Sequence, residues 1–294
     1  MTLIEFLTNH TYLTVVIGVA LAAASSAAVG TLIYLRRQAP LGDVVAHSAL
    51  PGTLIAFIIG SSLVTDARSL PLLTAGALIT GLLGAYLGHR IAKLTPITET
   101  TAMALIATVM FAGGMLLLGY IQQGNFAQKG GITSYLFGSA GQLTQADIIL
   151  SAVIAALLFG TLAINWRAFQ LTTFDRQFSA TRGIKLATYD QLLFLLLAAA
   201  TVAGMRAVGL LLIIGFTVIA PAAARQWCKT LRSTTVTAVA FACGAALFGS
   251  YLSIAVFALP TGPLVVLLLT LIFLFSIAFA PQRGLIAKAL RGRL

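Results

Sequence analysis

An aspartate and a histidine stand four residues apart in a strongly apolar part of the chain. Asp43 and His47 belong to the stretch A-P-L-G-D-V-V-A-H-S-A-L-P-G, residues 39–52. On a helix, this spacing places both side chains on one face, one turn apart. A carboxylate offers a hard oxygen and an imidazole a borderline nitrogen, a combination that suits Mn²⁺, Zn²⁺ or Fe²⁺. The pair is therefore a candidate metal-binding site.

A structural role is the alternative explanation of the same two residues. Asp43 could cap a helix that starts after Pro40, while His47 bonds to a neighbouring helix. Asp43 follows Arg37 by six residues. At about 1.5 Å per residue it lies roughly 9 Å into the apolar segment, and His47 lies about 6 Å deeper. That depth disfavours a surface cap and favours a functional role, because ionisable groups inside membrane segments are costly.

The composition predicts the elements that must position this pair. The chain has 294 residues, of which 59% are hydrophobic and 9% charged. Because each membrane-spanning helix needs about 20 apolar residues, we expect an all-α, polytopic helical membrane protein surrounded by membrane lipid. The net charge of +11 comes from Lys and Arg in short bursts between apolar runs. This pattern is typical of cytoplasmic loops and does not indicate a nucleic-acid partner.

The distribution of Lys and Arg predicts about nine spans, with eight as the alternative. The N-terminus is expected outside and the C-terminus in the cytoplasm. Of the 18 Lys and Arg, only Arg68, Lys129 and Arg206 then fall outside or within the membrane. Two spans are joined directly at residues 206–207, where one segment could be a half-helix. The predicted spans are residues 11–35, 41–63, 71–91, 96–120, 146–166, 189–206, 207–224, 234–259 and 264–280.

Glu99 is a further candidate for the path on which Asp43 and His47 would lie. It follows Lys93 by six residues and could line the same cavity from another helix. The alternative is an ordinary acid in the first turn of a helix after Pro96, where it favours the helix N-terminus.

The polar interval at residues 167–188 predicts a protein contact on the cytoplasmic side. It mixes Phe169, Leu171, Phe174 and Phe178 with charge, which indicates a short amphipathic helix that docks on another protein. None of the five lysines of the chain follows a glycine, so the sequence has no phosphate-binding G-x-x-x-x-G-K-[ST] loop. A transporter built from this chain must therefore use an ion gradient or an ATPase in another chain.

Several stretches, in this order and spacing, resemble those of a known family. They are L-G-D-V-V-A-H-S-A-L-P-G, S-Y-L-F-G, F-D-R-Q-F-S-A-T-R-G and R-A-V-G-L-L-L-I-I-G-F-T-V-I-A-P-A-A-A-R, followed by L-P-T-G-P. Over nearly its full length, the chain resembles the permease subunits of the zinc/manganese/iron-type ABC metal-ion importers. The resemblance implies a single transmembrane permease domain over residues 1–294. It also implies a transported manganese, zinc or iron ion, no permanently bound cofactor and no enzymatic activity in this chain.

The resemblance also implies partners and a location. Two permease chains, identical or paralogous, would surround a central pathway in a bacterial cytoplasmic (inner) membrane. Two cytoplasmic ATP-binding subunits would drive transport, and an extracytoplasmic metal-binding protein would deliver the ion.

The family's functional residues match specific positions of this sequence. Asp43 and His47 match its intramembrane metal-coordinating pair. Residues 174–183, within the cytoplasmic coupling segment 167–188, match its coupling helix. The residues expected to couple to the ATPase are Phe174, Asp175, Phe178 and Gly183. Arg176 departs from the pattern, because the family often has proline after the aspartate.

Two other functions are weighed against this interpretation. A permease of the related iron-siderophore or cobalamin ABC importers would share the layout but move a bulky chelate, and it would not need the Asp–His pair. An intramembrane metalloprotease that uses His47 would need further ligands in the H-E-x-x-H style. The other histidines, His10 and His89, are expected at opposite ends of spans, which disfavours the protease.

Overall fold

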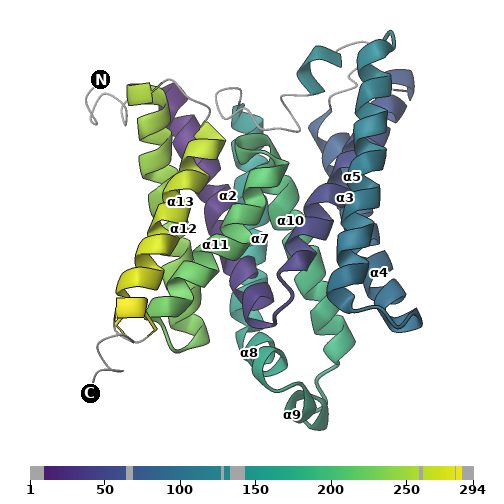
Figure 1. Ribbon diagram of the computed structural model, residues 1–294. Helices are drawn as coiled ribbons and strands as arrows, with labels where there is room; N and C mark the ends of the chain where they lie inside the picture. Colours follow the sequence, from purple (N-terminus) through teal and green to yellow (C-terminus); the bar gives the residue numbers. More distant parts are fainter. Residues whose placement is uncertain are drawn as a thin grey trace.

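The computed structural model describes residues 10–63, 69–126, 129–132, 143–257, 261–281 and 283–286. Within these residues all regular structure is helical (Figure 1). The elements are α2 (His10–Leu35), α3 (Pro40–Leu63), α4 (Leu70–Leu94), α5 (Glu99–Gln123), η1 (Lys129–Gly131), α7 (Gln145–Ile164), α8 (Trp166–Phe174), α9 (Arg176–Thr181), α10 (Leu186–Val208), α11 (Leu210–Trp227), α12 (Leu231–Tyr251), η3 (Leu252–Phe257) and α13 (Thr261–Phe279).

Eight helices in the described part of the chain are long and apolar enough to cross a membrane. They are α2, α3, α4, α5, α7, α10, α12 and α13. The prediction of an all-α, polytopic membrane protein is confirmed. The remaining predicted span, 207–224, corresponds to α11, a helix of 18 residues that packs against α2, α12 and α13. Arg68, one of the cationic exceptions, lies outside the described residues.

The break between α10 and α11 falls at Gly209, three residues after the predicted junction at 206. Gly209 has a φ of 91°, in the left-handed region that glycine adopts without steric cost. Its amide still donates to the Met205 carbonyl and ends α10. The chain therefore passes from one helix to the next through a single residue.

Threonine caps set where several helices begin. The Thr98 hydroxyl accepts a hydrogen bond from the Thr101 amide, so α5 begins at Glu99, three residues after the predicted start at 96. Thr144 and Asp147 form a capping box at the start of α7. These caps satisfy amides that have no partner inside the helix.

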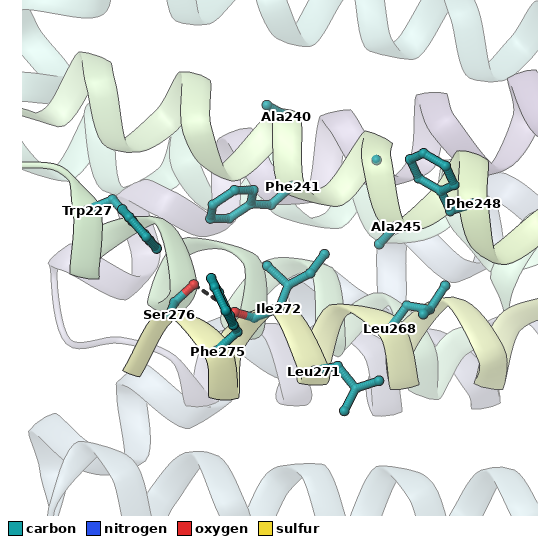
Figure 2. Close-up of a pocket in the computed structure, with 11 residues that line it drawn as sticks. Trp227, Ala240, Phe241, Ala245, Phe248, Leu268, Leu271, Ile272, Phe275 and Ser276 are labelled. Carbon is teal, nitrogen blue, oxygen red and sulfur yellow. Dashed lines mark hydrogen bonds between the residues drawn. The ribbon is translucent and has the colours of Figure 1, made fainter. Parts of the chain in front are cut away.

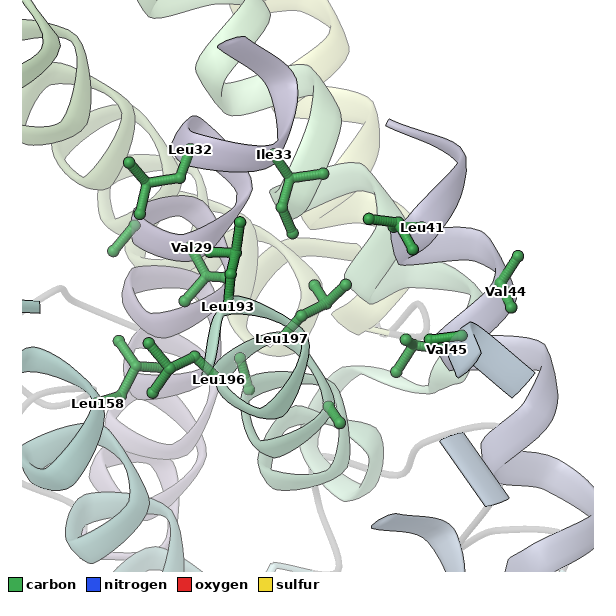
Figure 3. Close-up of a cluster of buried hydrophobic side chains, with 14 of the residues drawn as sticks. Val29, Leu32, Ile33, Leu41, Val44, Val45, Leu158, Leu193, Leu196 and Leu197 are labelled. Atoms are coloured by element: carbon green, nitrogen blue, oxygen red, sulfur yellow. The ribbon is translucent and has the colours of Figure 1, made fainter. Parts of the chain in front are cut away.

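A buried apolar cluster holds the start of α3 against its neighbours. Figure 3 shows side chains from α2, α3, α7 and α10 that converge in this cluster. The α3 members Leu41, Val44 and Val45 are all completely buried. By helical geometry these three residues share one side of α3, and Asp43 and His47 lie on the other. The packing therefore leaves the candidate pair away from the core.

Small residues bring α3 and α4 into close contact beside that pair. A Cβ atom on Gly84 would collide with the Ser48 side chain, and one on Gly52 would collide with the backbone of Gly76. Close approach of this kind is how membrane helices gain packing energy without a hydrophobic driving force between them. Gly84 thus faces α3, whereas Gly88 on the same helix faces Met103 of α5.

The predicted orientation in the membrane can be tested by labelling of single cysteines. With Cys228 and Cys243 replaced first, Ser61→Cys near the end of α3 should react with an impermeant thiol reagent added from outside. Ala180→Cys in α9 should not, because α8 and α9 project from the opposite end of the bundle (Figure 1). Labelling of residue 180 from outside in intact cells would reverse the arrangement.

Candidate metal site

The side chains of Asp43 and His47 are in close polar contact at the start of α3. His47 Nε2 lies 3.0 Å from Asp43 Oδ1, so the expectation that both side chains share one face is confirmed. Asp43 sits in the first turn of α3, where the helix dipole favours a negative charge. The alternative structural role also predicts that position. The position of Asp43 is therefore compatible with both a metal-binding role and a structural role. The contacts of His47 distinguish the two.

The second ring nitrogen of His47 is unused. Among the described residues, Nδ1 is buried and has no hydrogen-bond partner. The ring packs edge-on against Phe111 of α5, with centroids 4.9 Å apart. In the neutral tautomer that carries its proton on Nε2, Nδ1 has a free lone pair. A purely structural histidine is expected to use both nitrogens, since a buried polar atom without a partner is costly.

The spacing of the pair suits two ligands of one ion. Ligand atoms about 2.1 Å from a metal, at a right angle to each other, lie about 3.0 Å apart. Nε2 of His47 and Oδ1 of Asp43 are 3.0 Å apart. The Asp43 side chain is 45% exposed and that of His47 is 17% exposed. The pair is therefore open on one side to a ligand or to another chain.

Pro51 leaves one backbone oxygen of α3 without its helical donor. It lies inside α3, four residues after His47. Because proline has no amide hydrogen, the His47 carbonyl has no donor in the helical hydrogen-bond pattern. Carbonyl oxygens suit hard ions such as Mn²⁺. His47 can thus offer a nitrogen and an oxygen, although the described residues contain no cluster of three or more His, Cys, Asp or Glu.

Glu99 does not join this pair in a cluster. It begins α5 and its Oε1 lies 3.4 Å from Nδ1 of His89, near the end of α4. Both side chains are more than one third exposed. The expectation that Glu99 suits a helix N-terminus agrees with its position, and a role on the pathway stays a prediction.

The predicted coupling segment forms two short helices, α8 and α9, that meet at Asp175. The Asp175 side chain accepts a hydrogen bond from the Phe178 amide and caps α9. Gly183 follows α9 with a φ of 75°. Phe174 and Phe178 are 56% and 43% exposed. Phe169, by contrast, is completely buried, with its ring edge-on to Tyr189, so it is unavailable for docking.

Sequence reasoning missed Asp190 altogether. This carboxylate pairs with Arg36, which is 154 residues away in the chain, and with Arg176, which is 14 residues away. No spacing rule links residues so far apart. A lone acid in the first turns of an apolar helix, beside a basic interval, is the one signal that the sequence offers.

An apolar groove between α12 and α13 supplies no metal ligands. Figure 2 shows its lining, which comes from Trp227 at the end of α11 and from residues of α12 and α13, around a volume of about 790 Å³. Its hydroxyl group, on Ser276, donates to the Ile272 carbonyl at 2.7 Å. The candidate metal site is therefore the α3 pair and not this groove.

Comparison with known proteins supports a specific family. The model of the ABC 3 transport family matches residues 5–280. The chain belongs to this family. As an ABC 3 protein it is a membrane permease subunit of an ABC transporter and a multi-pass membrane protein.

Two curated relatives and one solved structure resemble this ABC 3 permease over most of its length. The manganese transport system membrane protein MntC of Bacillus subtilis (strain 168) is 37% identical over 277 residues, which cover 94% of this chain and 62% of that protein. The zinc transport system membrane protein TroC of Treponema pallidum (strain Nichols) is 34% identical over 291 residues, with coverages of 99% and 96%. The structure of PsaBC from Streptococcus pneumoniae in complex with Fab superposes with a TM-score of 0.85 at 25% identity, with coverages of 99% and 98%.

Proposed function

We propose that this permease imports a divalent transition-metal ion, manganese, zinc or iron, across a bacterial cytoplasmic membrane. The observation that carries the proposal is the Asp43–His47 pair, with a nitrogen and an oxygen 3.0 Å apart and a second nitrogen unused. The relatives that the chain resembles are named for manganese and zinc transport. Both metals accept carboxylate and imidazole ligands.

A second permease chain would complete the site. Two side chains of one copy are too few for a tetrahedral or octahedral ion. A twofold axis beside the exposed side of Asp43 would bring a second Asp43 and a second His47 to the same ion. Binding must also stay weak enough for release, because conduction requires that an ion leave the site that it enters.

Energy and substrate would come from partner proteins. The sequence has no phosphate-binding loop, so two cytoplasmic ATP-binding subunits would drive transport. They would contact the coupling segment through Phe174, Asp175, Phe178 and Gly183. An extracytoplasmic binding protein would deliver the metal to a single transmembrane domain over residues 1–294. The metal is then a substrate, and the permease needs no resident cofactor.

Uptake into vesicles distinguishes metal import from chelate import. The permease is co-expressed with its ATPase and binding protein, purified as a complex and reconstituted. We expect ATP-dependent accumulation of at least one of Mn²⁺, Zn²⁺ and Fe²⁺, measured together by elemental analysis, and no accumulation of a ferric siderophore or cobalamin. Uptake of a chelate without free metal would favour the alternative importer, for which the Asp43–His47 pair has no use.

A further inference from the structure

A buried arginine at the end of α2 is hydrogen-bonded to the coupling segment. The Arg36 side chain is 3% exposed. Its Nη2 donates to the Thr172 hydroxyl at 2.6 Å and its Nε to the Thr173 hydroxyl at 3.2 Å. Both threonines belong to α8, 136 and 137 residues further along the chain. One guanidinium group thus joins α2 to α8.

Asp190 extends this contact to α9 and α10. Its Oδ1 accepts from Arg36 Nη1 at 2.8 Å, and its Oδ2 accepts from Arg176 Nη2 at 2.7 Å. Burial lowers the pKa of Arg36, and the Asp190 charge opposes that effect. Asp190 lies near the start of α10 and Arg176 begins α9. The carboxylate therefore bridges one buried and one half-exposed arginine across three elements.

The turn after Arg36 leads directly to the candidate metal site. Arg37 adopts a φ of 60°, a strained conformation for a residue other than glycine. Gln38 donates to the Ile33 carbonyl, and Leu41 donates to Gln38. α3 then begins at Pro40, and Asp43 lies in its first turn. A displacement of Arg36 would reach Asp43 through this short hydrogen-bonded turn, with no flexible linker between them.

We infer that Asp190 and Arg176 are positioning residues that transmit movement of the coupling segment, through Arg36, to the start of α3. The inference rests on the proposed function, because it requires an ATPase to move α8 and α9. In this arrangement the ATPase shifts α9, the two ion pairs carry the shift to the end of α2, and Asp43 and His47 change their approach to the ion. Import then stays tied to ATP hydrolysis.

Arg176→Gln is the sharpest variant for a test. The Arg176 side chain is 49% exposed, so its loss leaves no buried charge without a partner, and the Arg36–Asp190 pair remains. Arg167→Gln is the matched control, because Arg167 is an exposed arginine of the same segment at the start of α8. Arg176→Lys keeps the charge and tests rescue.

The measurement is the number of ATP molecules hydrolysed per metal ion imported by the reconstituted complex. We expect Arg176→Gln to raise this ratio by about fivefold or more, within the usual range of coupling between sites. ATPase rate, assembly and metal binding should stay at the parental level. Arg176→Lys should restore most of the coupling, and Arg167→Gln should match the parent.

If Arg176→Gln hydrolyses as many ATP molecules per imported metal ion as the parent, the inference is wrong. It is also wrong if the variant loses transport only because the complex fails to assemble. The second result would mean that the ion pairs stabilise the structure and do not transmit movement. Asp190→Asn, which weakens both pairs at once, should uncouple at least as strongly, and a parental ratio in that variant would contradict the inference again. A parental complex that imports no metal at all would instead contradict the proposed function.

Discussion

Asp43→Asn and His47→Ala should each reduce metal uptake by the reconstituted complex to background. Each variant removes one of the two side-chain ligands that one copy supplies, and a twofold-symmetric complex would lose two of its four side-chain ligands. Changes to groups that only support metal ligands cost about 10- to 100-fold in affinity or activity, so loss of a ligand itself should cost at least about 100-fold. Uptake of radioactive or isotopically enriched metal measures the effect.

Matched variants separate a ligand from a structural pair. Asp43→Glu keeps a carboxylate and should retain part of the uptake. His10→Ala removes a histidine at the start of α2 and should transport as the parent does. Expression, assembly and thermal stability of Asp43→Asn should stay close to parental, because the Asp43 side chain is half-exposed and its ion-pair contact is with a neighbour four residues away on the same helix.

One specific result would exclude Asp43 and His47 as metal ligands. If Asp43→Asn and His47→Ala both transport metal at the parental rate, the contact between Asp43 and His47 is structural. The pathway ligands would then have to be sought elsewhere, with the His89–Glu99 pair as the next described group to test.

The sequence predicted the spans well because their signal is local. A membrane helix is defined by a continuous apolar run and by the charges at its ends. Both lie within a single stretch of the chain, so Pro40–Leu63 agrees with the prediction of 41–63 to within one residue. The Asp43–His47 contact was predictable for the same reason, since a spacing of four residues on one helix fixes a shared face.

Contacts between distant segments were not predictable in this way. Phe169 and Phe178 look alike in the sequence, yet one is completely buried and the other is exposed. Their exposure depends on how α8 and α9 pack against α10, which no local pattern specifies. The ion pairs of Asp190 depend on the same packing. The lack of a partner for His47 Nδ1 likewise depends on the packing of α5 against α3, which the sequence does not specify.

Phe174→Ala combined with Phe178→Ala should abolish association of the ATPase with the permease. Both rings are exposed in this chain, so the isolated permease loses little buried surface and should stay folded. Buried aromatic anchors at the centre of an interface each contribute about 2 kcal/mol or more. Together they would weaken ATPase binding by about a thousandfold. Co-purification of the ATPase with tagged permease, and ATP-driven uptake, measure this loss.

The exposure pattern provides the controls for that experiment. Ile164→Ala removes a strongly exposed apolar side chain at the end of α7, two residues before the start of α8, and should leave ATPase binding intact. Phe169→Ala should act differently, because it opens a cavity in the core and should lower the melting temperature of the permease itself. Normal ATPase binding and uptake in the Phe174/Phe178 double variant would show that α8 and α9 are an ordinary connection with no docking role. The ATPase would then have to bind the permease through other exposed loops at the same end of the bundle.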